Sequence, residues 1–458
     1  MTLTHRYIAR IVLEAETGLF VGSGEASLLK DALVQKDHHG LPMIQGTSLA
    51  GVLRHSIEKS HEDKKVWEEL FGFQEKNAGM GSRLRVSSAY MMINKTSVAE
   101  GLNPDIEKIK DRYENLPSRQ HVRITEKGVA QDTGLFDNEI VYKGSRFLFE
   151  LELKGTKEDA PRWETLLSTL SSPLFRIGHG TRNGYGKLKV LTLRTKAFDL
   201  TTPVDFEAYL HFDPSFNASN SCLKEANPGT STIKVDTYKL HLEPDSFFIF
   251  GKGAGDDEAD NIPVEEEVAM YTTDTIQFIK QTLIPASSIK GALAHRTAFH
   301  FNKLNHKYID RHEGDSGKDN PAVSTLFGFE SEGSKEKKGH RGRVILDDLY
   351  YSSEKVNNDK IFNHVAIDRF TGGAMDGALF SEKVSVVANK GTIEFTVYLE
   401  RIGADIDQDI RNAFEEALID VCKGLLPLGG MTTKGHGIFT GKVIKNNNPT
   451  PLFDYDTF

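Results

Sequence analysis

The ten residues 177–186 read IGHGTRNGYG, and a related stretch, LGGMTTKGHG, occupies residues 428–437. Short glycine-rich stretches match by chance, so the neighbouring sequence decides whether the chain repeats itself. Five further landmarks occur in the same order in both halves. They are GSG at 22–24 and GKG at 251–253, GTSLAGVL at 46–53 and ASSIKGAL at 286–293, LFGF at 70–73 and at 326–329, RLRV at 83–86 and RGRV at 341–344, and HV followed by LF at 121–122 and 135–136 and again at 364–365 and 379–380. Landmarks in one conserved order within the chain indicate two copies of one domain.

Each copy carries the same series of hydrophobic patterns. Polar and apolar residues alternate over 7–14 and 238–243, which predicts an opening strand. A helix follows the Thr/Ser steps at 47–48 and 287–288, whose hydroxyl groups can cap its first turn. The rest of each copy predicts a strand, a strand, a helix and a last strand, at 83–88, 146–153, 163–170 and 187–191 in the first copy and at 343–346, 392–399, 410–425 and 438–443 in the second. This βαββαβ order predicts an α+β protein of two tandem ferredoxin-like (RRM-like) domains with long inserted loops.

The boundary between the copies falls in a polar, turn-rich stretch at residues 217–231. Such a composition is typical of connections between domains. We therefore predict a first domain at residues 1–200, a linker at 201–231, a second domain at 232–446 and a C-terminal tail at 447–458.

The composition limits the possible classes of function. The 458 residues are 38% hydrophobic and 26% charged, and two of them are cysteines. Two cysteines exclude a Cys-rich zinc site, and no apolar run approaches the roughly 18 residues of a membrane span. We therefore expect a cytoplasmic protein without membrane contacts. The net charge of −9 argues against unspecific coating of nucleic acid. A local basic groove remains compatible with it, because much of the acidic excess lies in stretches that we interpret as loops, at 256–260 and 265–267.

Three motifs give the chain a resemblance to a known family. They are the Gly-x-Gly step with its acidic loop and helix start, the stretch HVAIDRFTGGA at 364–374 followed by GALF at 377–380, and the glycine-rich loop before each last strand. Together they resemble the RAMP superfamily, specifically the backbone subunits of type III CRISPR effector complexes. The tandem fusion is similar to the double-domain subunits of subtype III-D. The resemblance implies that the partners are CRISPR guide RNA, target RNA, a large polymerase-like subunit and further RAMP subunits.

The two glycine-rich loops are the first candidates for contact with the RNA backbone. Glycine lets a phosphate approach the main chain closely and leaves N–H groups free to face an anion. Each loop also carries a basic residue. The candidates are Gly178, Gly180, Arg182 and Gly184 in the first copy and Gly430, Lys434 and Gly435 in the second. The competing interpretation is a tight turn between helix and strand that needs glycine for its geometry.

The starts of the two predicted helices are further candidates. Ser48 and Ser288 lie in the first turns, where main-chain N–H groups and the helix dipole favour a phosphate. The same residues could serve only as caps. Arg54 and Lys290 lie on these helices, where they could reach the guide RNA or simply be solvated.

The stretch DRFTGG at residues 368–373 predicts a loop, because its two glycines interrupt regular structure. The resemblance implies that this region forms a thumb-like loop that intrudes into the guide–target duplex and flips a base. Arg369 and Phe370 suit that role, since unstacked bases need aromatic or basic partners. The corresponding residues 124–130 of the first copy, ITEKGVA, lack the Asp-Arg pair, which leaves the contacts of that loop open.

The acidic loop after Gly-x-Gly is the candidate for catalysis. The resemblance implies that an aspartate in this loop cleaves target RNA with Mg²⁺ or another divalent cation. Asp31 matches that position, and the same spacing from Gly-x-Gly places Asp260 in the second copy. A carboxylate can hold a divalent cation that assists attack by a 2′-OH on its adjacent phosphate. Asp256 and Asp257 are alternative acids in the second loop, and a solvated acidic loop is the simpler interpretation of both copies.

Three other functions stay open on the sequence. The first is the same scaffold without catalysis. The second is a metal-independent guide-RNA processing endonuclease of the same superfamily, acting through a histidine near the first helix, for which His55 and His295 hold equivalent places. The third is a tandem RRM-like adaptor. Cleavage that EDTA stops would distinguish the metal-dependent nuclease from the processing enzyme.

Overall fold

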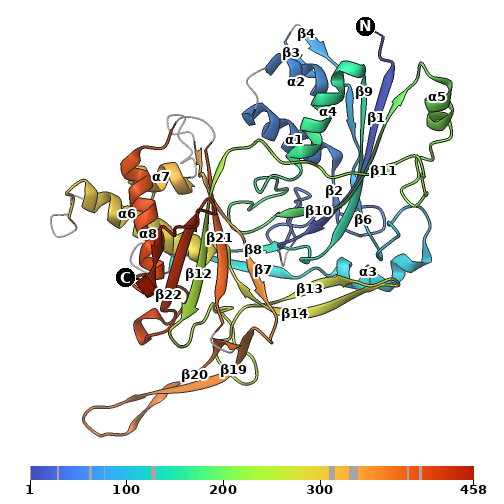
Figure 1. Cartoon of the computed structure of the whole chain (residues 1–458). Helices are drawn as coiled ribbons and strands as arrows, with labels where there is room; N and C mark the ends of the chain where they lie inside the picture. The colour runs from blue at the N-terminus through green and yellow to red at the C-terminus, as the bar shows by residue number, and fades with distance from the viewer. Residues whose placement is uncertain are drawn as a thin grey trace.

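The strand that opens each copy lies in the middle of its sheet (Figure 1). In the first copy, β1 (His5–Ala15) pairs with β10 (Leu188–Asp199) on one side and with β9 (Arg146–Gly155) on the other. On its other side β9 pairs with β5 (Leu84–Val86) and, further along its length, with β6 (Ala89–Met91). All of these pairs are antiparallel. The order of fourth, first, third and second strand is that of a ferredoxin-like domain.

The second copy has the same strand order, with β22 (Phe439–Lys445), β12 (Val235–Pro244), β21 (Ile393–Glu400) and β17 (Val344–Leu346). The predicted α+β class with two ferredoxin-like domains is therefore confirmed. This computed structural model describes residues 2–27, 30–60, 64–76, 78–124, 130–308, 315–329, 339–388, 391–401 and 405–457.

Helices cover each sheet and close its core. The first domain has α1 (Gly46–Ser60) and α4 (Ala160–Thr169), and the second has α6 (Ala286–Leu304) and α8 (Gln408–Cys422). Alternate residues of a strand face the same side, and the fully buried residues of β9 follow this period: Phe147, Phe149, Leu151 and Leu153. They share a core with Leu49 and Leu53, which lie one turn apart on α1. The apolar positions from which these elements were predicted are thus the positions that are buried in the structure.

The other elements are short. They are β2 (Met43–Ile44), α2 (Lys64–Phe71), β3 (Phe73–Glu75), β4 (Ala78–Met80), β6 (Ala89–Met91) and α3 (Glu107–Glu114) in the first domain, and α7 (Pro321–Phe327), β15 (Gly328–Phe329), β16 (His340–Arg341), β18 (Leu349–Tyr351) and β23 (Phe453–Asp454) in the second. Each LFGF landmark spans the end of a short helix, α2 or α7, and the start of the short strand that follows.

The segment at residues 201–231, predicted as a linker from its polar turns, contains α5 (Pro203–Leu210) and β11 (Lys224–Glu225). β11 extends the first sheet by pairing with β10. Arg10 of β1, which is almost fully buried, donates a hydrogen bond of 2.7 Å to the main-chain oxygen of Asp213. The segment therefore packs against the first domain.

Each copy inserts a β-hairpin after its second strand. The first consists of β7 (Ser118–Ile124) and β8 (Ala130–Glu139), and the second of β19 (Val356–Ile367) and β20 (Ala374–Val387). His121 faces Phe136 in the first hairpin, as His364 faces Phe380 in the second, so the HV and LF landmarks are equivalent cross-strand pairs. Figure 1 shows β19–β20 projecting far from the second domain. Residues 125–129, between β7 and β8 in the sequence, lie outside the described residues.

A second long hairpin, which we call the arm, crosses from the second domain to the first. It consists of β13 (Glu265–Tyr271) and β14 (Ile276–Ile284). The stretch 265–267, predicted as a loop, is thus the start of a strand, and that prediction is wrong. The corresponding stretch of the first copy makes only a short turn, closed by the pair Lys36 and Pro42.

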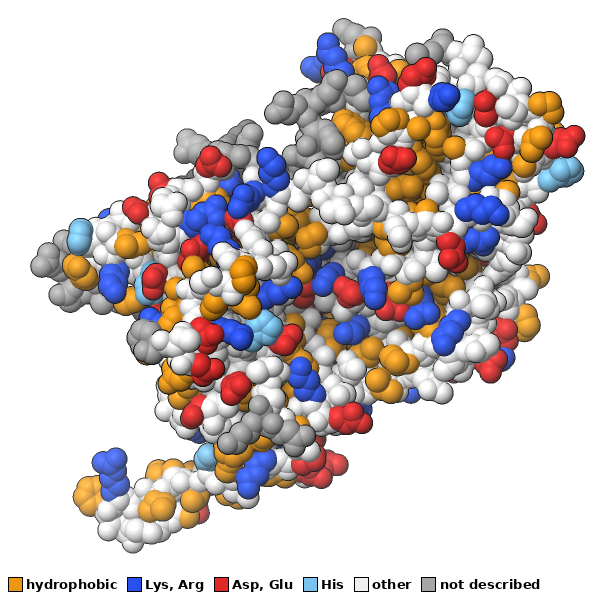
Figure 2. All heavy atoms as spheres, viewed as in Figure 1, with side chains coloured by type: hydrophobic (Ala, Val, Ile, Leu, Met, Phe, Trp, Pro, Cys, Tyr) orange, Lys and Arg blue, Asp and Glu red, His pale blue; other side chains and the backbone are white. Residues whose placement is uncertain are grey.

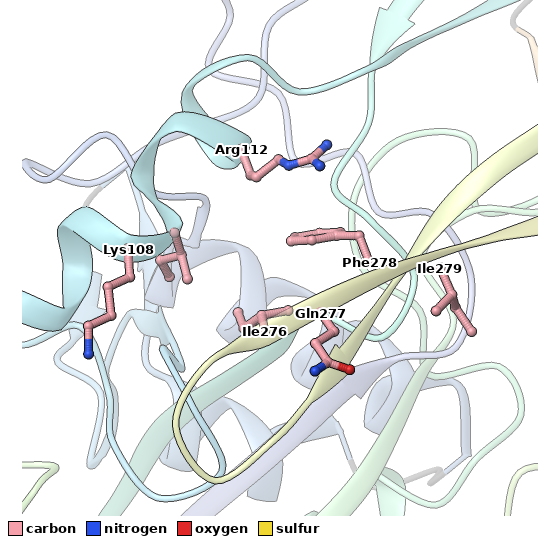
Figure 3. Close-up of a pocket in the computed structure, with 7 residues that line it drawn as sticks. Lys108, Arg112, Ile276, Gln277, Phe278 and Ile279 are labelled. Atoms are coloured by element: carbon pink, nitrogen blue, oxygen red, sulfur yellow. The ribbon is translucent and has the colours of Figure 1, made fainter.

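The arm completes the core of the first domain. Tyr271 and Ile276 are buried within the first core, away from the core of their own domain. The hydroxyl of Tyr271 donates a hydrogen bond of 3.0 Å to the main-chain oxygen of Met92. Figure 3 shows Arg112 of α3 extending over the ring of Phe278, with 5.3 Å between its guanidinium carbon and the ring centre. The two domains are therefore interlocked by shared apolar packing.

Candidate RNA-binding surface and nuclease sites

The glycine-rich loops lie against the segment that precedes the acidic loop in each copy. Gly178 has a φ of +92°, and a β-carbon there would lie 2.2 Å from the main-chain oxygen of Phe20. At Gly429 the φ is +96°, and the same atom would lie 2.4 Å from the oxygen of Ile249. Only glycine tolerates this combination of dihedral angle and close approach. The interpretation as a tight turn therefore accounts for these two glycines without RNA.

The two loops differ in what covers them. A β-carbon at Gly184 would lie 2.1 Å from Oδ1 of Asp348, which belongs to the second domain. A β-carbon at Gly435 would meet no described atom within 4 Å, and its neighbour Lys434 is exposed. The second loop, including Gly430, is therefore the one open to a ligand.

Arg182 lies in the interface between the domains. Its Nε donates to the main-chain oxygen of Gly342 at 2.5 Å, and its Nη2 pairs with Glu400 at 2.6 Å. Burial, followed by the neighbouring Arg341, lowers the pKa of Arg182 to about 10. Gly180 lies in the same loop and packs against the ring of Tyr185. The guanidinium of Arg182 thus has partners inside the protein, and its contact with RNA stays a prediction.

The start of α6 faces the first glycine-rich loop. The main-chain N–H of Ala286 donates to Oδ1 of Asp348 at 2.9 Å, so a carboxylate already occupies this helix end. Lys290 reaches back to Oδ1 of Asn183 at 3.3 Å. Burial and then Arg182 lower the pKa of Lys290 to about 8. Ser288 is exposed in the same first turn, beside a carboxylate that opposes a phosphate at this helix end.

The start of α1 has a neutral partner in place of that carboxylate. Its first N–H, at Gly46, donates to Oγ of Ser88 at 3.2 Å, and Ser48 lies in the first turn. Arg54 donates to the main-chain oxygen of Gly72 at 3.2 Å. Of the two helix starts, α1 is electrostatically better suited to bind a phosphate.

Charges of both signs are interspersed between the domains. A cleft there is lined by Lys95, Lys143, Arg146, Lys187 and Lys355 and also by Glu14, Glu16, Asp347 and Glu394. Figure 2 shows the same mixture of Lys or Arg and Asp or Glu over the middle of the face in view. The interface between the domains is therefore not a uniformly basic groove.

The turn at the tip of β19–β20 presents an aromatic ring to solvent. Phe370 is fully exposed, and Arg369 beside it is exposed as well. Oδ1 of Asp368 accepts the N–H groups of Phe370 and Thr371 at 2.7 and 3.0 Å, which holds the turn. The predicted loop is confirmed as this turn. An exposed phenyl ring next to a guanidinium is a surface on which a base can stack.

Asp31 and Asp260 hold equivalent positions at the bases of the two hairpins. Oδ2 of Asp31 accepts the N–H of Asp137 at 3.0 Å, and Oδ2 of Asp260 accepts the N–H of Ser381 at 2.8 Å. Asp137 directly follows the first LF landmark, and Ser381 directly follows the second. Both aspartates are exposed. Each carboxylate thus links its acidic loop to β8 or β20.

The two acidic sites differ in their second carboxylate. In the first copy a second hydrogen bond joins the same two residues, since Oδ1 of Asp137 accepts the N–H of Asp31 at 2.9 Å. In the second copy this place is taken by Ser381, whose Oγ donates to Asp260 at 2.8 Å. Asp137 was not predicted from the sequence, although its position directly after the LF landmark was the available signal.

One alternative acid of the second loop, Asp256, is paired with a lysine of β20. Lys383 Nζ pairs with Asp256 at 2.7 Å, and this hydrogen bond, followed by main-chain donors, lowers the pKa of Asp256 to about 2. The main-chain N–H of Ser381 and then its hydroxyl lower the pKa of Asp260. Within the described ranges, no group of three or more His, Cys, Asp or Glu side chains could hold a metal ion. Any cation here would depend on one or two protein carboxylates.

His55 and His295, the candidates for metal-independent processing, are both exposed on their helices. His55 lies 3.1 Å from Nη1 of Arg341. This places His55 beside the interface between the domains.

The fold and these sites define a class of protein with tandem ferredoxin-like domains, each carrying a glycine-rich loop, an inserted hairpin and an acidic loop at the base of that hairpin. A family model described as the RAMP superfamily matches residues 12–189 and 273–440, which make up most of the chain. The chain belongs to the RAMP superfamily. Membership supports a CRISPR-associated, RNA-binding role in a complex with other subunits. No curated protein matches the chain. Among the described residues, no helix has the length and apolar character needed to cross a bilayer.

Proposed function

We propose that the chain is a backbone subunit of a type III CRISPR effector complex that holds guide RNA and cleaves paired target RNA at two sites. The observation that carries this proposal is the equivalence of Asp31 and Asp260, each hydrogen-bonded to the base of one inserted hairpin. A hairpin that displaces a base would leave the adjacent phosphate close to such an aspartate. Its partners would be further RAMP subunits and a large polymerase-like subunit in the cytoplasm, with a tandem organisation like that of subtype III-D.

The chemistry requires few protein groups. A divalent cation would lower the barrier to attack of the 2′-OH on the adjacent phosphate. Carboxylate oxygens are suitable ligands for Mg²⁺, which keeps several waters and is bound through one or two carboxylates. Asp31 and Asp137 would hold it in the first copy, and Asp260 in the second. The pair of carboxylates favours the first site for cation binding.

A non-catalytic scaffold is the second candidate. The same hydrogen bonds favour it, because each aspartate already anchors a hairpin to its acidic loop. A test must therefore remove the charge and keep the anchor, which Asp→Asn does, since the amide oxygen can still accept the N–H of Asp137 or Ser381.

The deciding experiment incubates the assembled complex with an end-labelled RNA complementary to the guide, with Mg²⁺ and with EDTA. We expect Asp31→Asn and Asp260→Asn each to remove one discrete product and the double variant to remove both, with target binding unchanged. Asp257→Asn, at an exposed acid of the same second loop, should leave all products in place. Identical products from all four variants would assign the cutting to another subunit and make this chain a scaffold.

The exposed ring at the tip of β19–β20 gives a second prediction. Phe370→Ala should weaken binding of the target RNA to the guide-loaded complex by about 1–3 kcal/mol, the usual contribution of one base stacked on an aromatic ring. Titration of labelled target RNA measures this loss. Phe370→Trp keeps a stacking surface and should bind as the wild type does. Equal affinities for the Ala and Trp variants would exclude a stacking role for this position.

A further inference from the structure

Buried ion pairs join the two copies of the domain. In each pair an arginine of the first copy contacts a carboxylate of the second, and none of these side chains is more than 16% exposed. The pairs are Arg119 with Asp348, Arg176 with Asp347, and Arg182 with Glu400. Because a buried charge without its partner is costly, these pairs restrict which surfaces can come together in this way.

The first copy has a surface equivalent to the one that carries these carboxylates. The first N–H of α1 donates to Ser88, as the first N–H of α6 donates to Asp348. The N–H of Lys154 donates to the residue before β5, as that of Glu400 donates to the residue before β17. Two tandem copies form one such contact, so this second surface has no partner within the chain. We call it the receiving face, and it consists of Ser87, Ser88 and Lys154.

The receiving face has lost the negative charge of its counterpart. Two serines stand where the second copy has two aspartates, and Lys154 stands in place of Glu400. Lys154 is exposed, and no described side chain pairs with its ammonium group. The neighbouring strands β3 and β4 lie at the end of the first domain that points away from the second (Figure 1). The receiving face is therefore open and carries a positive charge.

The second copy has lost the matching arginines. Phe362 takes the place of Arg119, as the cross-strand registers of the two hairpins show. The two glycine-rich loops have the same length and equivalent main-chain hydrogen bonds, which puts Thr433 in the place of Arg182. The third arginine is replaced by a proline. If two copies of this chain met in the same way, Phe362 would face a serine and Thr433 would face Lys154.

The arm gives a second reason why two copies of this chain do not fit together. It belongs to the second copy and buries Tyr271 and Ile276 in the core of the first. The first copy has only a short turn in its place, closed by Lys36 and Pro42. The first copy of another molecule would therefore offer no arm to the second copy of this one. Both the ion pairs and the shared core would be missing from such a contact.

We propose that the receiving face binds a RAMP domain of a different subunit, whose glycine-rich loop carries an aspartate or glutamate opposite Lys154, and that it excludes a second copy of this chain. This inference rests on the other RAMP subunits of the proposed function and is independent of the cleavage sites. A partner carboxylate pairs with Lys154, whereas a neutral loop leaves this ammonium group buried and unpaired. Specificity against the wrong partner arises in this way.

The first test treats the assembled complex with a carbodiimide, which joins a lysine amine to a carboxylate in direct contact with it. Digestion and mass spectrometry then identify the joined peptides. We expect Lys154 to be joined to an acid in the glycine-rich loop of another RAMP subunit. A link from Lys154 to a second copy of this chain, or the lack of any link to another subunit, overturns the inference.

Reversing the charge should release that subunit. Lys154→Glu places two carboxylates opposite each other, so it should lower the fraction of complexes that retain the subunit at least about tenfold. Lys154→Arg should retain it. Lys224→Glu is the matched control, because it makes the same change at an exposed lysine of β11, at the far edge of the first sheet. Native mass spectrometry measures the composition, and equal compositions for the two glutamate variants contradict the inference.

Two measurements on the purified chain separate the possible failures. Self-association in sedimentation that Lys154→Glu abolishes would mean that the receiving face binds a second copy, which overturns the inference. Weaker filter binding of guide RNA by Lys154→Glu, with an unchanged subunit composition, would make this face an RNA site and overturn it as well. Either result leaves the proposed function in place. A wild-type chain that purifies with no other RAMP subunit counts against the proposed function, and this inference falls with it.

Discussion

Replacing Arg119 by Met should lower the free energy of unfolding by about 3–5 kcal/mol, the usual cost of removing one partner of a buried ion pair. Arg119 of β7 is 7% exposed and lies 2.5 Å from Oδ2 of Asp348, whose side chain is fully buried in the second domain. It also makes two hydrogen bonds of 2.7 Å to Glu266 of the arm. Met fills a similar volume, so the loss measures the two carboxylates left without their cation. Urea denaturation followed by circular dichroism provides the measurement.

The loss should depend on pH. Burial raises the pKa of Asp348 even with Arg119 beside it, so in the variant the carboxyl should take up a proton as the chain folds. A group whose pKa is higher in the folded state contributes stability at low pH that is lost as the pH rises. The deficit of the variant should therefore be smaller at pH 5 than at pH 8.

Arg112 provides the control for this experiment. It pairs with Glu267 of the same arm at 3.2 Å, but its side chain is 56% exposed. Exposed ion pairs contribute about 1 kcal/mol or less, so Arg112→Met should have a small effect. Equal losses for the two variants would contradict the assignment of a buried, structurally important pair to Arg119.

Tyr271→Ala should destabilise the first domain by about 3–5 kcal/mol, although Tyr271 belongs to the second copy. Its ring lies in the first core, and its hydroxyl both donates to the main chain of Met92 and accepts the N–H of Arg146, each at 3.0 Å. Truncation leaves a cavity and two unpaired main-chain groups. We expect the single unfolding transition of the wild type to separate into two, because the arm no longer completes the first core.

Two neighbouring variants make this prediction specific. Tyr271→Phe keeps the ring and loses only the two hydrogen bonds of the hydroxyl, so it should cost about 1–3 kcal/mol, less than Tyr271→Ala. Met270 is 49% exposed on the other side of β13, so Met270→Ala should change stability by less than about 0.5 kcal/mol. A Tyr271→Ala variant that unfolds like Met270→Ala would mean that the arm does not stabilise the first domain.

Local patterns predicted much of the fold. Alternation in β9 and the one-turn spacing of Leu49 and Leu53 report which faces are buried, and burial determines both the elements and their packing. The internal repeat then showed which residues of the first copy correspond to which residues of the second. Asp31 and Asp260 could be aligned from their distance to Gly-x-Gly alone, and both were found at the base of a hairpin.

Contacts between segments that are distant in the sequence could not be predicted in this way. Arg182 sits in a loop whose composition suits an anion, yet its partner is Glu400 in the other domain. Glu266 lies in an acidic run typical of a solvated loop, yet Arg119 pairs with it. Asp137 is far from Asp31 in the chain. Each of these pairs forms only because two segments that are distant in the sequence come into contact in the fold. Hydrophobic periodicity and turn residues are local patterns, so they do not predict which distant segments will be in contact.

The arm also determines the spacing of the two cuts that the chain would make in RNA. Because Tyr271 and Ile276 of the second copy are part of the first core, a flexible tether does not set the separation between Asp31 and Asp260. The packing of the arm in the first core sets the distance between the two aspartates. In the proposed function, the number of nucleotides between the two cuts would therefore be a constant of the protein, the same for every guide and every target sequence.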